Sequence, residues 1–259
     1  MSGYNDFAYF YDGLFDIEEY EKRCRYIVGI LKENGISDGI LLDVACGTGT
    51  LSEMLSDEGF DVIGIDGSED MLGVAMEKKA ESGRNIQYLH QNMSEIDLFG
   101  TIKCAVCTLD SINHVTSPEE VERCFEKIGL FTEKDGIFIF DVNTEYKHRE
   151  ILKNNTFVYD TDEVFCVWQN ELEEKTGSVH IFLDFFSPCG GDTYERYSEE
   201  FDEVLYSEKW LSDTLGKYGF EVTGIYDDLT KEPLRKDSER AVFVCRKTVE
   251  TNGFFAEKE

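Results

Sequence analysis

The segment LLDVACGTGTLSEMLSDEG, residues 41–59, constrains the fold of this chain more than any other stretch. An apolar run that carries one acid, Asp43, breaks at Gly47 and Gly49 and then continues with apolar residues at helical spacing. Glycine lets the backbone bend sharply and lets a ligand approach the main chain closely. A strand, a glycine-rich turn and a helix in this order predict a ligand-binding crevice at the carboxyl end of a sheet.

The alternation of strand and helix continues on both sides of this turn. The apolar patterns predict strands over residues 39–44, 60–66, 85–91, 103–109, 136–142, 220–228 and 240–247. They predict helices over 50–59, 68–83, 117–131 and 207–219, with Ser68 and Ser117 as N-caps. Strands alternating with helices of this length are typical of βαβ units. The predicted fold class is therefore α/β, a doubly wound, Rossmann-like and mostly parallel sheet of seven strands.

The pattern changes after residue 152. Residues 156–206 contain several strand-like runs, separated by turn-forming residues at 160–162, 174–177 and 189–192. Such a pattern predicts an inserted antiparallel β meander. We therefore expect a Rossmann-like core formed by residues 1–152 and 204–247, an antiparallel insertion at 153–203, and a loose tail at 248–259.

Charge restricts the partners of the chain. It has 54 acidic and 25 basic residues, which gives a formal net charge of −29. Nucleic acids and anionic membrane surfaces both require cationic neutralisation, so neither is an expected partner. The charge can steer a cationic substrate, although an acidic surface that keeps the protein soluble is the simpler interpretation. The sequence shows neither a secretory signal pattern nor an apolar run of about 18 residues. Oligomeric state cannot be read from this sequence.

Eight cysteines are scattered without a regular framework, which favours a reduced, cytoplasmic compartment. Cys104 and Cys107 form a C-x-x-C pair, a spacing found in metal and redox sites. They lie within a predicted strand, where residues three apart point to opposite faces. The sequence contains no second pair to complete a zinc site, so we predict no metal.

The glycine turn can serve two classes of ligand. A dinucleotide fingerprint requires G-x-G-x-x-G, and Ser52 occupies the third position. That motif also places a pyrophosphate at the helix N-terminus, where Asp43 would repel it. An acid before the glycines instead suits a nucleoside that carries a positively charged amino-acid tail, so an NAD-dependent oxidoreductase is disfavoured.

The motifs resemble those of class I S-adenosylmethionine-dependent methyltransferases, in the branch that acts on small molecules. Asp43-x-Ala45-x-Gly47-x-Gly49 is similar to motif I of that family, with Ala45 in place of a glycine. DGSEDMLGVA, which begins at Asp66, resembles the family's second motif, whose acid binds both ribose hydroxyls. After the third strand, Asn92-Met93 replaces the usual Asp-Met that faces adenine.

The resemblance implies S-adenosyl-L-methionine as cofactor. It extends to the N-terminal YNDFAYFYDGLF, which folds over the cofactor in that family and would bring Tyr11 near the sulfonium. The loop TLDSINHV resembles the segment under the methionine moiety, and the insertion corresponds by position to a substrate lid. The implied cofactor-binding residues are Tyr11, Asp43, Ala45, Cys46, Gly47, Thr48, Gly49, Asp66, Gly67, Met71, Asn92, Met93 and Leu109.

Methyl transfer from a sulfonium needs mainly alignment, so the cofactor residues are easier to recognise than a general base. Tyr11, Asp110 and His180 are the catalytic candidates, although a lone strand histidine is more often structural or solvated. The expected activity is methyl transfer to a small-molecule acceptor by in-line displacement. The alternative is an S-adenosylmethionine-binding regulator or partner subunit without transferase activity. The candidates for substrate contact are His114, Trp168, Tyr194, Arg196 and Tyr197.

Overall fold

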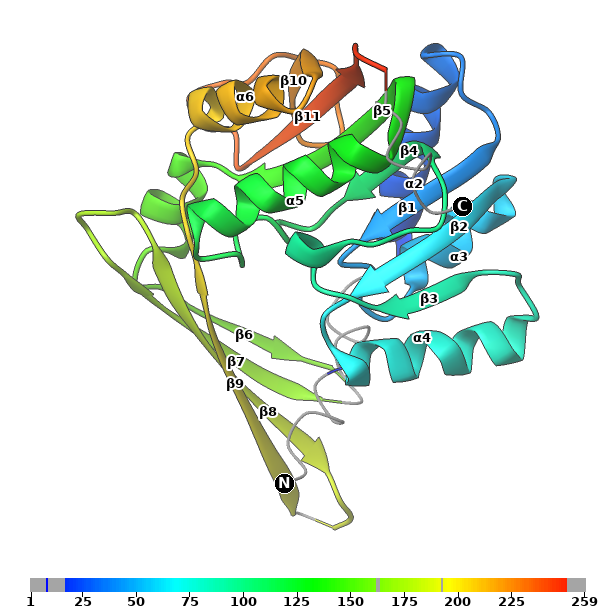
Figure 1. Cartoon of the computed structure of the whole chain (residues 1–259). Helices are drawn as coiled ribbons and strands as arrows, with labels where there is room; N and C mark the ends of the chain where they lie inside the picture. The colour runs from blue at the N-terminus through cyan, green and yellow to red at the C-terminus, as the bar shows by residue number, and fades with distance from the viewer. Residues whose placement is uncertain (1–7, 9–16, 162–163, 192, 251–259) are drawn as a thin grey trace.

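The structure is a computed structural model that describes residue 8 and residues 17–161, 164–191 and 193–250. Two separate β-sheets form its framework, one of seven strands and one of four (Figure 1). Tyr11 lies outside the described residues, and its predicted role stays a prediction.

The seven-stranded sheet has the order β10-β11-β5-β4-β1-β2-β3. Only β11 runs antiparallel to its neighbours β10 and β5, while the remaining pairs are parallel. The predicted doubly wound, mostly parallel sheet of seven strands is thereby confirmed. Its strands are β1 (Gly39–Val44), β2 (Phe60–Asp66), β3 (Gln87–His90), β4 (Ile102–Cys107), β5 (Thr132–Asn143), β10 (Phe220–Asp227) and β11 (Arg240–Lys247).

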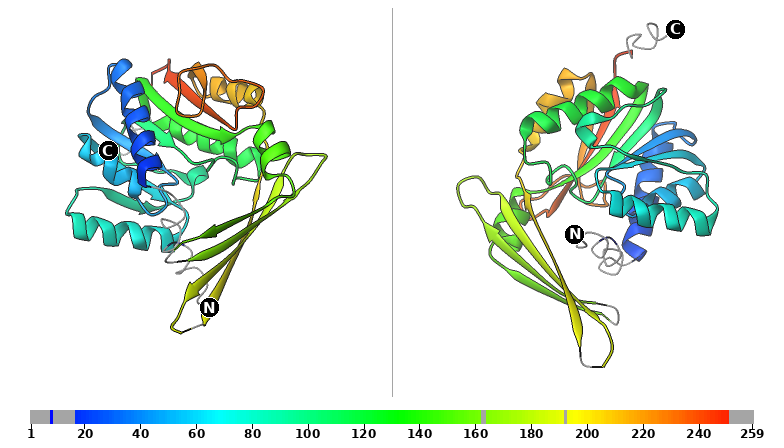
Figure 2. Two further views of the ribbon diagram at one scale, coloured as in Figure 1. Left: turned by 180° about the vertical axis from the view of Figure 1, so that it is seen from behind. Right: turned by 60° about the horizontal axis from the view of Figure 1, so that its bottom comes forward.

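Helices cover both faces of this sheet (Figures 1 and 2). Ser68 and Ser117 cap two of them as predicted, because their side chains accept hydrogen bonds from the backbone N–H groups of Met71 and Glu120. The helical elements are α2 (Ile17–Glu33), α3 (Thr50–Asp57), α4 (Glu69–Ser82), η1 (Met93–Glu95), α5 (Pro118–Phe131), η2 (Lys147–Leu152) and α6 (Glu208–Lys217). None of the helices described combines the length and apolar character that a membrane span requires.

The two faces of the large sheet build two apolar cores. One packs against α5 and α6, and the other packs against α2 and α3. Cys104 belongs to the second core and Cys107 to the first, so the two thiols point to opposite faces of β4. This arrangement confirms the sequence-based reading of the C-x-x-C pair as strand packing.

The four-stranded sheet is the predicted antiparallel meander. It consists of β6 (Thr156–Asp160), β7 (Phe165–Leu172), β8 (Val179–Pro188) and β9 (Tyr194–Glu203), in that order. It has a small apolar cluster of its own that includes Cys166 and Phe185. Its last strand returns to the large sheet, where Asn113 exchanges backbone and side-chain hydrogen bonds of 2.8 and 2.9 Å with Val204. These bonds tie the base of the small sheet to the loop after β4.

Candidate functional site

The glycine turn follows β1 and leads into α3, as the sequence predicts. Ala45, Gly47 and Gly49 all have positive φ angles, of 56°, 54° and 77°. Ala45 therefore adopts the left-handed conformation that the glycine of the family motif accepts without strain. Gly49 is also required for space, since an added Cβ would lie 2.3 Å from the hydroxyl oxygen of Tyr88.

Asp66 closes this turn from the neighbouring strand. β1 and β2 are parallel neighbours, so their carboxyl ends meet at the same edge of the sheet. One carboxylate oxygen of Asp66 accepts from the N–H of Gly47, and the other from the N–H of Ser68, both at 2.8 Å. Burial raises the pKa of Asp66, and these two bonds oppose the rise. Each oxygen keeps acceptor capacity for one further donor.

Asp43 lies beneath the turn rather than in the cavity. Its side chain is buried and accepts a hydrogen bond of 2.6 Å from the hydroxyl of Ser52. Burial raises the pKa of Asp43 to about 7, despite the opposing bond from Ser52. The expectation that Asp43 meets the charged tail of the ligand directly is not supported, because Asp43 does not line the cavity.

A cavity of about 810 Å³ lies at the carboxyl edge of the large sheet and reaches the small sheet. Residues from both sheets line it, including Trp168, Leu183 and Phe201 of the small one. The residues predicted to bind cofactor that line it are Ala45, Gly47, Asp66, Gly67, Met71, Asn92, Met93 and Leu109. Cys46, Thr48 and Gly49 belong to the turn but not to the cavity lining.

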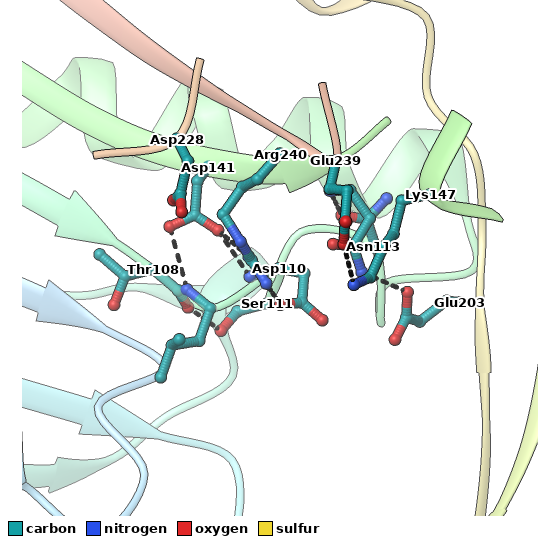
Figure 3. Close-up of polar contacts among 12 residues, drawn as sticks. Thr108, Asp110, Ser111, Asn113, Asp141, Lys147, Glu203, Asp228, Glu239 and Arg240 are labelled. Carbon is teal, nitrogen blue, oxygen red and sulfur yellow. Dashed lines mark hydrogen bonds and ion pairs between the residues drawn. The ribbon is translucent and has the colours of Figure 1, made fainter. Parts of the chain in front are cut away.

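The loop after β4 forms one wall of the cavity and has a strained backbone. Leu109 and Asp110 both have positive φ angles, of 57° and 53°. Their N–H groups donate to the two carboxylate oxygens of Asp141, at 3.1 and 2.8 Å (Figure 3). Asp141 also accepts from Arg23 at 3.0 Å and from Arg240, so four donors converge on one buried carboxylate. This network holds the strained loop against the ends of β5 and β11.

Arg240 links that network to the cavity. Its guanidinium pairs with Asp141 and, at 2.7 Å, with Asp110 (Figure 3). Burial acts to raise the pKa of Asp110, but Arg240 and His114 together hold that pKa well below its ordinary value. The carboxylate of Asp110 is therefore ionised throughout the physiological pH range.

Three titratable side chains meet at the far wall of the cavity. A carboxylate oxygen of Asp110, a ring nitrogen of His114 and a carboxylate oxygen of Glu203 lie within 4.8 Å of one another. Glu203 is 2% exposed and accepts a hydrogen bond of 2.8 Å from Asn143. His114 lines the cavity, lies 3.8 Å from Asp110 through Nε2, and packs its ring against Phe201 at 4.8 Å. Burial lowers the pKa of His114, but the charges of the nearby carboxylates of Asp110 and Glu203 raise it more.

The small sheet brings only part of its predicted set to the cavity. Trp168 lines it, and the indole N–H donates to Asn170 at 2.7 Å. Tyr194 is 61% exposed, and Arg196 forms a bidentate pair with Asp184. The remaining two candidates also lie outside the cavity lining. Tyr197 packs against the apolar cluster of the small sheet, and His180 is hydrogen bonded to Asp202 at 2.6 Å.

The polar residues of the cavity that sequence reasoning missed include Asn143, Lys147, Glu203 and Arg240. Asn143 ends β5, and Glu203 and Arg240 lie at the ends of β9 and β11, so each sits where a strand reaches the cavity. No local motif marks them, because they meet the glycine turn only through the tertiary fold.

Comparisons with known proteins agree with this geometry. Residues 41–136 match the family model described as a methyltransferase domain. A protein of Geobacillus sp. (strain WCH70) that is named as a methyltransferase is 33% identical over 245 residues, which cover 94% of this chain and 99% of that protein. YqeM of Bacillus subtilis (strain 168), named in the same way, is 31% identical over 246 residues, which cover 95% of this chain and 97% of YqeM.

Among solved structures, an S-adenosylmethionine-dependent methyltransferase from Clostridium acetobutylicum ATCC 824 superimposes with a TM-score of 0.85. The two sequences are 30% identical, and the superposition covers 95% of this chain and 99% of the Clostridium protein. The sheet order, glycine turn and cavity define an α/β fold of the class that places its ligand-binding crevice at the strand ends. This chain belongs to the class I S-adenosylmethionine-dependent methyltransferases. It is a transferase whose cofactor is S-adenosyl-L-methionine, so the regulatory and NAD-dependent alternatives lose their support.

Proposed function

We propose that this enzyme methylates a small molecule enclosed between the large sheet and the small sheet. One observation carries the proposal. A single cavity runs from the cofactor motifs at Gly47 and Asp66 to Trp168 and Phe201 of the small sheet. Its volume of about 810 Å³ lies within the range of roughly 300–1,000 Å³ that is usual for small-molecule sites.

The residues at the inner end of this cavity fit S-adenosylmethionine. Asp66 has two oxygens already oriented by backbone donors, which suits the two hydroxyls of a ribose. The amide oxygen of Asn92 lies against Gly67, where an added Cβ would be 2.7 Å from it, and it can accept from the amino group of adenine. Ala45, Gly47 and Leu109 line the space expected for the amino-acid tail.

When bound, the cofactor supplies a methyl group on a positively charged sulfur. The chain then has to hold the acceptor in line with that group and to exclude water. Enforced alignment alone can contribute about 7–11 kcal/mol to such a displacement. The loop of Leu109 and Asp110, which Asp141 holds, and the small sheet are suited to this alignment, because both contribute side chains to the cavity lining.

The test is a methyl-donor assay with purified enzyme and a panel of amines, phenols, alcohols, sugars and carboxylic acids. Release of S-adenosylhomocysteine with at least one small acceptor is the expected result. A parallel panel of short RNAs and peptides serves as the comparison. Methylation of a macromolecule, with none of any small compound, would contradict the proposal.

A further inference from the structure

We infer that the acceptor is an amine that enters the cavity as a cation, and that His114, held between Asp110 and Glu203, takes its proton before methyl transfer. The inference rests on the function proposed above, since it names the substrate class and the proton acceptor of the same cavity.

The charge of the cavity lining carries the first step. Six carboxyl side chains line it, against two basic ones. Lys147 pairs with Glu239, and Arg240 pairs with Asp110 and Asp141. Within the described lining, both basic side chains therefore already have anionic partners. A carboxylate, phosphate or phenolate acceptor would meet repulsion here, whereas a cation would be attracted.

Glu199 and Glu203 are among the lining carboxylates that lack a strong cationic partner, and both lie on the small-sheet side of the cavity. Among the described residues, no lysine or arginine pairs with Glu199 or Glu203. Glu203 is buried, and His148 lies near it, with 3.4 Å between Nε2 and the carboxylate. Burial, followed by the charge of Asp70, raises the pKa of Glu199. A buried carboxylate that lacks a counter-ion is costly, and a cationic ligand would offset that cost.

His114 is placed to handle the proton of such a ligand. It is the histidine of the described cavity lining, and it lies on the loop that follows β4. Charged groups on three elements lie around it. Asp110 lies on the same loop, Glu203 on β9 and Arg240 on β11, and Arg240 also pairs with Asp141 of β5. His148 of η2 lies 3.4 Å from the carboxylate of Glu203. The two neighbouring carboxylates stabilise the protonated imidazole.

The chemical step balances with these groups. The ammonium form of the acceptor transfers one proton to Nε2 of neutral His114, and the resulting imidazolium is held by Asp110 and Glu203. The free lone pair on nitrogen then forms the bond to the methyl carbon, while the carbon–sulfur bond breaks and its electron pair goes to sulfur. The positive charge moves from sulfur to the methylated nitrogen. An amine must be neutral at the moment of attack, so a proton acceptor is needed in the cavity.

Three probes of one shape test the charge preference: benzylamine, benzyl alcohol and benzoate. Each is titrated into the full chain saturated with S-adenosylhomocysteine, and binding is followed by ligand-observed NMR. Benzylamine is expected to bind at least about tenfold more tightly than benzyl alcohol, the scale of one charge-assisted hydrogen bond.

This preference for benzylamine should be lost in Glu203→Gln or, if that variant does not fold, in Glu199→Gln. Glu200→Gln is the matched control, since Glu200 lies on the same strand and is exposed to solvent. Equal or weaker binding of benzylamine overturns the inference.

The proton acceptor is tested without any substrate. The chain contains four histidines, and NMR titration of a histidine-labelled sample, assigned with His114→Gln, follows each ring. The pKa of His114 should lie above the ordinary value for histidine, and Asp110→Asn should lower that pKa. A divalent cation that binds tightly to Asp110, His114 and Glu203 would overturn the role, because the imidazole nitrogen would then be a metal ligand.

The methyl-donor assay separates the two proposals. Transfer to hydroxyl compounds with none to amines overturns the amine inference and leaves the proposed function standing. Failure with every small compound removes the proposed function, while the binding preference still decides the charge of the ligand.

Discussion

The hydroxyl of Ser52 donates a hydrogen bond of 2.6 Å to the carboxylate of Asp43. Both side chains are buried, so the bond joins the end of β1 to the first turn of α3 beneath the glycine turn. Asp43 thereby supports the shape of the cofactor turn from below. The same Ser52 that breaks the dinucleotide fingerprint is the partner that this buried acid requires.

The first prediction concerns Asp43→Asn. Burial raises the pKa of Asp43 from 3.8 to about 7 in the folded chain. Between pH 4 and 7 the folded state therefore retains a proton that the unfolded chain has released, so the free energy of unfolding falls as pH rises through this window. The amide of the variant does not ionise, so its stability does not fall with pH in this way. Its oxygen still accepts the hydrogen bond from Ser52. We expect the variant to gain roughly 2–4 kcal/mol relative to the wild type between pH 5 and pH 8.

Urea unfolding at pH 5 and pH 8 measures this difference. Ser52→Ala is the companion variant, and it should cost more stability at pH 8, where the carboxylate is ionised and needs the donor. Identical pH slopes for wild type and Asp43→Asn would show that Asp43 does not titrate in this window.

The second prediction concerns Asp66→Asn and the affinity for S-adenosylhomocysteine. The substitution removes a carboxylate that two backbone N–H groups hold in place, so binding should weaken by about 1.5–3 kcal/mol, the value of a hydrogen bond to a charged group. Isothermal titration calorimetry gives the affinity directly. Asp61→Asn is the control, because Asp61 lies on the same strand and is exposed to solvent. An unchanged affinity in a folded Asp66→Asn protein would remove Asp66 from the cofactor site.

The sequence was sufficient to predict the sheet, the caps of α4 and α5, and the gathering of Gly47 and Asp66 at one end of the cavity. Each of these depends on local signals. Ser68 and Ser117 precede helical patterns, and Gly47 and Asp66 end strands that are parallel neighbours. Residues at the ends of parallel strands gather at one edge of a sheet, so their spacing along the chain already specifies their meeting in space.

The acceptor end could not be predicted in the same way. Glu203 and Arg240 reach the cavity because β9 and β11 return to it from distant parts of the chain. His180 and Arg196 are typical catalytic and binding residue types, but in the small sheet they pair with Asp202 and Asp184. An alternating strand pattern predicts which residues share a face, not which face meets the large sheet.

The third prediction concerns Asp141→Asn. Four donors converge on the buried carboxylate of Asp141, two of them from arginines and two from the strained loop of Leu109 and Asp110. Removing the charge leaves Arg23 and Arg240 without their shared counter-ion, so the variant should lose about 3–5 kcal/mol of unfolding free energy. Chemical denaturation measures the loss. Asp135→Asn, at an exposed position on the same strand, should change stability by less than about 0.5 kcal/mol. Similar losses in the two variants would show that the network does not hold the loop.

The last prediction compares His114 with His180 through the pH dependence of methyl transfer. The negative charge of Asp110 raises the pKa of His114, so this side chain is protonated and unable to accept a proton on the acid side of that pKa. The rate with the best amine acceptor should therefore fall as pH decreases through it. His114→Gln should lower the rate by about 10²–10⁴-fold and abolish the acid limb. Asp110→Asn should move the limb to lower pH, because it removes the partner that holds the proton.

His180→Gln should change the rate less than about twofold, since His180 pairs with Asp202 outside the cavity lining. Measurement of kcat/KM from pH 5 to pH 9 in the four proteins separates these outcomes, and an acid limb that survives His114→Gln would assign the proton to another group.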